Sequence, residues 1–302
     1  MSLVVNTNIA SMNAQRSLMA SGKELQSAME RLSTGKKINS AADDAAGFAI
    51  AENMTAQVRG LSMAAKNAND GLGLLKVVEN ATNDVTDMLQ RIRELAVQAQ
   101  SGTNSDSDID NLQLEANALI DEIGRVSEDT TYNNTAYLGS GASTSINIQV
   151  GYNDGDTITL QTYNVKAENL GVKVADVSGS AGDTVLVALK NADGTYLQID
   201  QTATAADGTT TDRVPGALEV ITTAIDQVAS YKAEWGAGQN RLEYTVSNLM
   251  NVVEFTTAAQ SRIQDADFAV EAARLAKAQV LQQTGTAMLA QANAAPQIAL
   301  QL

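Results

Sequence analysis

The chain has 302 residues, of which 44% are hydrophobic but only 4% are aromatic, and it contains two prolines. This composition favours long helices with thin cores of alanine, valine and leucine over a compact globule. The chain has no cysteine and no histidine, which excludes disulfides, thiol and imidazole catalysis and nearly all transition-metal sites, so we expect neither an enzyme nor a cofactor. The net charge of −15 argues against nucleic acid or an anionic membrane as a partner.

The N-terminal segment carries apolar residues at heptad-compatible positions, separated by polar residues. This pattern predicts an amphipathic helix that needs a partner, and we expect it to be poorly ordered in an isolated monomer because tertiary packing supplies most helix stability. The first eight residues lack the basic segment and apolar core of a cleaved signal, so an exported chain would leave by another route. The apolar positions are Val4, Ala14, Leu18, Leu25, Ala28 and Leu32.

A second, much longer helix is predicted after a break at Gly35. We expect Ser40 or Asp43 to cap its start and Ala99 to end it, just before a Ser-Gly pair. Its apolar residues recur at steps of three and four, which defines one seam. At about 1.5 Å per residue the seam spans close to 60 Å, so the helix needs an equally long partner. The seam consists of Leu61, Ala65, Ala68, Leu72, Leu75, Val78, Thr82, Val85, Leu89, Ile92, Ala96 and Ala99.

A shorter helix is predicted to begin at Asp106 or Ser107 and to fold back antiparallel, because the preceding loop is short. Its apolar positions are Ile109, Leu112, Ala116, Leu119, Ile123 and Val126.

The central part of the chain shows β-type alternation. Residues 145–150 and 157–162 alternate with period two around a Gly/Asn/Asp turn, which predicts a hairpin; the turn lacks the spaced ligands of a calcium loop. Residues 185–189 and 196–199 are predicted to be short strands joined by a turn. About 40 residues are too few for an independent core, so this part is expected to be a small β element.

The second long helix is predicted to open at Pro215-Gly216, and it supplies the partner that the first long helix needs. We expect Trp235 to be a core residue whose bulk is admitted by Gly236 and Gly238. Its seam consists of Leu218, Ile221, Ile225, Val228, Lys232, Trp235, Gln239, Leu242, Val246, Leu249 and Val253, and a last amphipathic helix carries Ile263, Ala266, Val270, Ala273, Val280 and Ala287.

Several stretches of the chain closely resemble bacterial flagellin. They are residues 32–51, which resemble the hinge between its inner and outer helical domains, and residues 89–98, 122–127, 261–269 and 291–302. The resemblance covers roughly residues 1–172 and 214–302. It implies a mainly α fold, with a long antiparallel helical bundle or coiled coil formed by the N- and C-terminal regions and a small, β-hairpin-rich outer element.

The resemblance also implies a division into three parts. Residues 1–42 and 258–302 would form a terminal coiled-coil domain in the filament core. Residues 43–172 and 214–257 would form a helical spoke with the hairpin, and residues 173–213 a short, variable outer β insertion.

A flagellin is a non-enzymatic subunit that polymerises helically into the filament of the bacterial flagellum and serves motility. The resemblance therefore implies that copies of the chain associate with one another, that the flagellar type III channel exports it, and that it is located outside the cell. The implied partners are a flagellar export chaperone, the filament cap protein, the hook-filament junction protein and the vertebrate flagellin receptor, which is the fifth Toll-like receptor.

The candidate site residues come from the resemblance and from helix geometry. In flagellins of β- and γ-proteobacteria the matching face binds the receptor and is buried between neighbouring subunits of the filament. From the spacing, Leu95 lies just off the seam, so it is either an exposed leucine that a partner buries or a residue that widens the core. The residues carried over by match are Gln90, Arg91, Glu94, Leu95, Gln98 and Glu115.

Surface hydroxyl groups are often O-glycosylated in this family. The candidates here are Ser140, Ser143, Thr144, Ser145, Thr202, Thr204, Thr209, Thr210 and Thr211, with an unmodified loop as the alternative.

Three other readings compete with a filament subunit. A hook-filament junction protein shares the terminal helices, and a secreted coiled-coil adhesin would display the β segment, although about 40 residues do not make a large receptor-like domain. Some flagellins resemble proteins that carry an inserted zinc protease domain. That enzyme needs a His-Glu-x-x-His helix, and this chain has no histidine.

Overall fold

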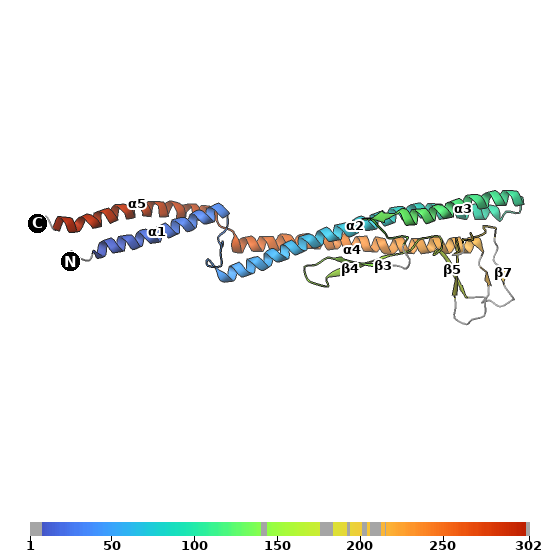
Figure 1. Cartoon of the computed structure of the whole chain (residues 1–302), viewed down its shortest axis with the longest axis horizontal. Helices are drawn as coiled ribbons and strands as arrows, with labels where there is room; N and C mark the ends of the chain where they lie inside the picture. The colour runs from blue at the N-terminus through green and yellow to red at the C-terminus, as the bar shows by residue number, and fades with distance from the viewer. Residues whose placement is uncertain are drawn as a thin grey trace. The chain divides into compact units, whose positions relative to one another are not determined.

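The structure is a computed structural model that describes residues 8–139, 144–175, 184–191, 194–200, 204–205, 213–214 and 216–299. Within these residues the chain forms five α-helices and four two-stranded antiparallel sheets (Figure 1), which agrees with the predicted mainly α class. The chain divides into two compact units, one of residues 1–60 with 251–302 and the other of residues 61–250.

In the first unit, helix α1 (Ile9–Thr34) lies antiparallel to helix α5 (Phe268–Ala299) (Figure 1). The Asn8 side chain caps α1 by accepting the backbone N–H of Ser11, and it also donates to the carbonyl of Ala292 at 2.7 Å. The predicted seam is confirmed, although serines also occupy it, and Val4 lies outside the described residues. The buried and half-buried seam positions are Ser11, Ala14, Leu18, Ser21, Leu25, Ala28 and Leu32.

The breaks between the helices of this unit are hydrogen-bonded to each other. Gly35 ends α1 with a φ of 70°, a left-handed conformation that suits glycine, and its carbonyl accepts the N–H of Ala266 at 3.0 Å. The N–H of Lys37 donates to the carbonyl of Gln264 at 2.6 Å, at the end of helix α4 (Ala217–Gln264). These bonds satisfy backbone groups that the helix ends would otherwise leave unpaired.

The start of helix α2 (Ala45–Ala99) corrects the predicted cap. Asp44, and not Ser40 or Asp43, accepts the first free N–H groups of the helix, those of Ala46 at 3.1 Å and Gly47 at 3.0 Å. The Asp43 carboxylate accepts the N–H groups of Asn39 and Ser40 instead, and these bonds lower its pKa. Asp43 therefore closes the turn before the helix, and Asp44 caps the helix.

In the second unit, α2 and α4 run antiparallel, as predicted. Gln239 of α4 donates to Glu79 of α2 at 2.8 Å, and Lys232 donates to Asn83 at 2.6 Å. Helix α3 (Asp106–Asp129) begins with a capping box between Ser105 and Asp108. The seam of α2 is buried along most of its length and forms a core with α3, α4 and the β segments.

The strands form short hairpins. The predicted hairpin is confirmed: β3 pairs with β4 from Thr144 opposite Thr162 to Gln149 opposite Thr157. Residues 196–199 do not form the predicted strand, because β6 pairs with β5 and only Tyr196 bridges to Lys190. The strands are β1 (Thr131–Tyr132), β2 (Thr135–Ala136), β3 (Thr144–Gln149), β4 (Thr157–Thr162), β5 (Gly171–Ala175), β6 (Thr184–Ala188), β7 (Thr204–Ala205) and β8 (Arg213–Val214).

Residues 197–199 are held by one backbone hydrogen bond, from the N–H of Leu197 to the carbonyl of Leu189 at 3.0 Å, and by a side chain of α3. The Gln113 amide donates to the carbonyl of Leu197 at 2.9 Å and accepts the N–H of Ile199 at 2.9 Å. One glutamine thus makes the pair of bonds that a neighbouring strand would have made.

Trp235 is a core residue, as predicted, with 2% of its surface exposed. The expected role of the two glycines is wrong, because a Cβ at Gly236 would meet nothing within 4 Å and one at Gly238 would meet Leu160 and Leu75. The indole N–H donates to the carbonyl of Gln161 at 2.8 Å, so hairpin contacts hold the ring in place.

Candidate interaction surfaces

An ionic network joins α2 to α3 on the exposed side of the second unit. The Arg91 guanidinium contacts Glu115 of α3 at 2.9 Å and Glu94, one turn further along α2, at 3.0 Å. Hydrogen bonds to Glu115 and then Glu94 raise the pKa of Arg91 above its ordinary value. Gln90 and Gln98 are exposed on the same helix. The structure thus brings these five predicted residues to the exposed surface of two adjacent helices.

Leu95, the sixth predicted residue, is not exposed: the accessible fraction of its surface is 0%. The alternative in which it widens the core is correct. Helix α2 packs against other elements on more than one side, so a second set of positions, spaced by seven residues, is buried or half-buried beside the seam. This set is Leu74, Ala81, Met88 and Leu95.

Other apolar residues do lie at this surface. Val97 is 56% exposed, and it lines a shallow groove together with Arg93, Gln98 and Ile225 of α4. Leu114, next to Glu115 in α3, is 67% exposed. Sequence reasoning missed both, although Val97 falls outside the seam spacing and could have been recognised as an apolar residue on the polar side of α2.

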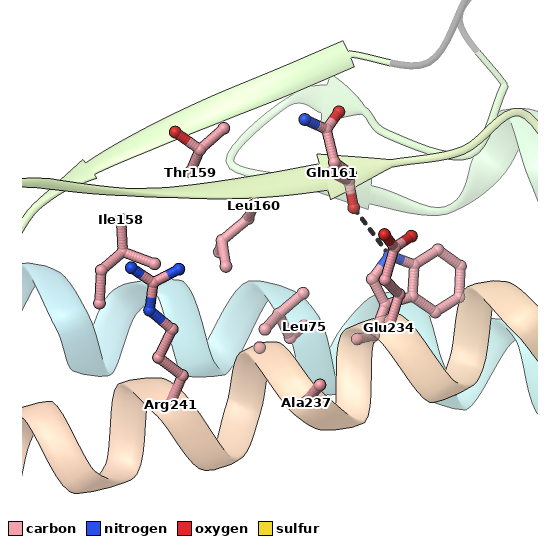
Figure 2. Close-up of a pocket in the computed structure, with 10 residues that line it drawn as sticks. Leu75, Ile158, Thr159, Leu160, Gln161, Glu234, Ala237 and Arg241 are labelled. Atoms are coloured by element: carbon pink, nitrogen blue, oxygen red, sulfur yellow. Dashed lines mark hydrogen bonds between the residues drawn. The ribbon is translucent and has the colours of Figure 1, made fainter.

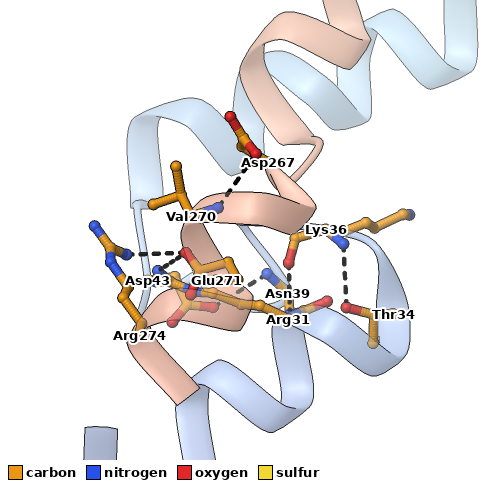
Figure 3. Close-up of polar contacts among 9 residues, drawn as sticks. All are labelled: Arg31, Thr34, Lys36, Asn39, Asp43, Asp267, Val270, Glu271 and Arg274. Carbon is orange, nitrogen blue, oxygen red and sulfur yellow. Dashed lines mark hydrogen bonds and ion pairs between the residues drawn. The ribbon is translucent and has the colours of Figure 1, made fainter. Parts of the chain in front are cut away.

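A buried carboxylate lies between α1 and α5 in the first unit. Glu271 is 5% exposed and accepts from Arg31 of α1 at 3.3 Å and from Arg274 at 2.9 Å (Figure 3). A carboxylate buried without such partners would be strongly destabilising. Sequence reasoning missed this pair, although Glu271 lies four residues before Leu275 and seven before Ala278 on one helix face.

The seam predicted for the last helix is not the one that faces α1. Ile263 belongs to α4, and Val270 and Val280 are exposed, because Glu271, Ala278 and their heptad neighbours face α1 instead. The first unit therefore keeps a second set of large apolar side chains at its surface. These residues are Ile9, Met12, Met19 and Met29 of α1 and Phe268, Val270, Val280, Leu281 and Met288 of α5.

The chain was compared with known proteins. Residues 5–144 match the family model described as the bacterial flagellin N-terminal helical region, and residues 218–302 match the C-terminal one. A flagellin of Xenorhabdus nematophila is 41% identical over 100% of this chain and 99% of its own length. The chain belongs to the bacterial flagellin family. A flagellin of Bacillus subtilis is 40% identical over 99% of each chain. A crystal structure of Bacillus cereus flagellin matches 61% of this chain and 88% of its own, with 25% identity and a TM-score of 0.44.

The charge of this flagellin is divided unequally between its two units. Of its 35 acidic and 20 basic residues, nine of each fall in residues 1–60 and 251–302, so the first unit has no net charge. The remaining 26 acidic and 11 basic residues lie in the second unit, which carries the whole −15. The unit with the exposed apolar side chains of α1 and α5 is thus the one in which copies would not repel each other.

Most glycosylation candidates of this flagellin lie outside the described residues. Ser145 is exposed on β3, and Thr144 and Thr204 belong to β3 and β7. The candidates outside the described residues are Ser140, Ser143, Thr202, Thr209, Thr210 and Thr211.

The described part of this flagellin contains no group of three acidic, histidine or cysteine side chains placed to hold a metal ion. None of its described helices combines the length and hydropathy needed to cross a bilayer.

Proposed function

We propose that the chain is a structural subunit that polymerises into the bacterial flagellar filament, and that the exposed apolar side chains of α1 and α5 drive this assembly. The observation that carries the proposal is the first unit itself. Pairing of α1 with α5 buries one face of each helix, yet nine large apolar side chains remain exposed on the two helices. Such a concentration of apolar surface is typical of a protein interface.

The second copy is the partner that this surface fits. The unit has no net charge, so the close approach of many copies carries little coulombic cost. A contact between two different patches of identical copies generates a helical filament when its rotation does not close a ring.

The finer partners belong to the same proposal. We infer that the chain leaves the cell through the flagellar type III channel with an export chaperone, and meets the cap and junction proteins at the filament ends. The three-part division of the chain, with the terminal coiled coil of residues 1–42 and 258–302 in the filament core, stays a prediction, as does O-glycosylation. Exposure of Ser145 on β3 supports that residue as an acceptor, and mass spectrometry of purified filaments tests it.

The Arg91 network is proposed as the face that contacts neighbouring subunits and the vertebrate receptor. Arg91, Glu94 and Glu115 are fixed relative to one another yet accessible, which suits a charged contact surface. Leu95 supports this face from beneath and does not touch a partner. We expect Arg91→Ala to weaken both receptor signalling and filament packing, and unchanged signalling would remove the receptor part of the proposal.

The assembly proposal is tested with a charge placed on the apolar surface. Val280→Glu adds a carboxylate at an exposed apolar position of α5, and Gln279→Glu adds the same charge at the exposed polar position beside it. Purified monomers are seeded with filament fragments and examined by sedimentation and electron microscopy. Loss of long filaments with Val280→Glu but not with Gln279→Glu supports the proposal, whereas equal assembly by both variants overturns it.

A further inference from the structure

A small apolar cavity lies between the β3–β4 hairpin and helices α2 and α4 (Figure 2). Strand β4 alternates along its length, so Ile158 and Leu160 point toward the helices and form the roof. Leu75 of α2 forms part of the opposite wall. Trp235 of α4 also lines the cavity. The cavity has a volume of about 200 Å³, which is more than a water molecule or a single methyl group fills.

Gly238 of α4 lines the cavity, and a larger residue here would take up part of its space. A Cβ at this position would point into the space and meet Leu160 and Leu75, each at 3.4 Å. Glycine inside a helix costs about 1 kcal/mol relative to alanine, so the chain bears this cost at a position where the missing side chain leaves space unfilled. The cavity is thus open to an apolar group from outside.

Two charged side chains of α4, Glu234 and Arg241, lie at the mouth of the cavity, and their hydrogen-bond partners differ. The Glu234 carboxylate accepts the hydroxyl of Tyr163. Arg241 forms no ion pair with any residue in the part of the chain that the structure describes, and Figure 2 shows its guanidinium beside Ile158 at the edge of the cavity. Tyr163 is a neutral donor, so neither charged group has a counterion among the described residues. The Glu234 carboxylate is already hydrogen-bonded, however, whereas the Arg241 guanidinium has no hydrogen-bond partner there and can bind an acceptor from outside.

We propose that this cavity binds a small carboxylic acid, with its apolar body between Leu160, Leu75 and Trp235 and its carboxylate against Arg241. An apolar protein cavity of about 150 Å³ holds a benzene ring, so 200 Å³ accommodates a phenyl ring with a short aliphatic link. The guanidinium fork matches a carboxylate geometrically and pairs with it through charge-assisted hydrogen bonds. This ligand site is separate from the surfaces assigned to assembly.

Trp235 is the only tryptophan of the chain and lines the cavity, so its fluorescence reports binding directly. The probe is 3-phenylpropionate, titrated into the full-length monomer, with 3-phenylpropanamide as the neutral analogue. We expect a saturable change in Trp235 emission with a Kd of about 1 mM or tighter, and binding of the amide three- to tenfold weaker. Absence of a saturable change overturns the proposal.

Two variants separate the roles of the cavity and of the charge. Gly238→Leu fills the space and should abolish binding, whereas Gly236→Leu, at a position with open surroundings, should leave binding unchanged. Arg241→Gln should weaken binding of the acid three- to tenfold and leave binding of the amide unaltered.

Gly238→Ala is measured in parallel as a variant that keeps the fold, because its Cβ makes ordinary contacts. Undiminished binding by Gly238→Ala overturns the assignment. Equal binding of acid and amide by the unaltered chain does so as well.

Discussion

Replacing Leu95 by alanine should destabilise the folded monomer, because the structure selects the core position from the two predicted alternatives. Its side chain is fully buried and belongs to the core of the second unit. Truncation removes three buried carbon atoms and leaves a cavity that the long packed helices can close only in part. For fully buried leucines the expected loss is about 2–5 kcal/mol of unfolding free energy.

The measurement is urea unfolding of the monomer, followed by the fluorescence of Trp235, which lies in the same unit. Val97→Ala is the matched control, because Val97 lies two residues away on the same helix but is 56% exposed, and we expect a change within about 0.5 kcal/mol. Arg91→Ala, which removes two exposed ion pairs, should cost at most about 1 kcal/mol.

A destabilisation below about 1 kcal/mol for Leu95→Ala would contradict the burial argument and return Leu95 to the surface. A large destabilisation has a practical consequence for functional assays. Loss of signalling or assembly by Leu95→Ala would then reflect a weakened fold, so Arg91→Ala is the variant that tests the surface itself.

Three further predictions concern glycine substitutions in the helices, the pKa of Asp121 and the effect of salt on assembly. Gly124→Ala, at an open helix position, should stabilise the monomer by about 0.5–1 kcal/mol, and Gly71→Ala should stabilise it less, since its Cβ would meet Ile148 at 3.3 Å; thermal unfolding compares them. Hydrogen bonds from Lys190 and then Tyr196 lower the pKa of Asp121 below its ordinary value of 3.8. The Asp121 carboxylate therefore stabilises the fold above pH 3.8, and this contribution is lost as the pH falls through the lowered pKa. NMR titration of the carboxyl group should show the lowered pKa, and Lys190→Met should raise that pKa. Added salt should lower the protein concentration needed for polymerisation, because it screens the repulsion between the acidic second units of neighbouring copies. Sedimentation measures this concentration.

The helices could be predicted from the sequence because the spacing of their apolar residues shows the helical period directly. The seam and the end of α2 and the start of α3 were read from spacing and from Ser/Asp/Gly signals, and these depend on residues close in sequence. The choice between Asp43 and Asp44 as the cap could not be made in this way, since both side chains suit the position and only the loop path decides.

Leu95 illustrates what periodicity cannot decide. A single helix defines its apolar seam, but the width of the buried stripe depends on how many neighbours cover it. Helix α2 is covered by α3 and by α4, and the sequence of α2 alone does not contain that information. The strand β5 was missed for a related reason, because its pairing with β6 joins residues that are not close in sequence.

The seam between α1 and α5 explains why the first unit should associate with other copies. Small residues such as Ser11, Ser21 and Gly285 occupy seam positions, so the helices approach closely while burying little apolar surface. Burial stabilises by about 25 cal/mol per Å², and a thin seam therefore holds the pair only weakly. The larger side chains, methionines, valines and a phenylalanine, lie on the outside of the pair instead. Because these exposed side chains can be buried only between copies, we predict that assembly stabilises the terminal helices, and hydrogen exchange of monomer and filament measures this.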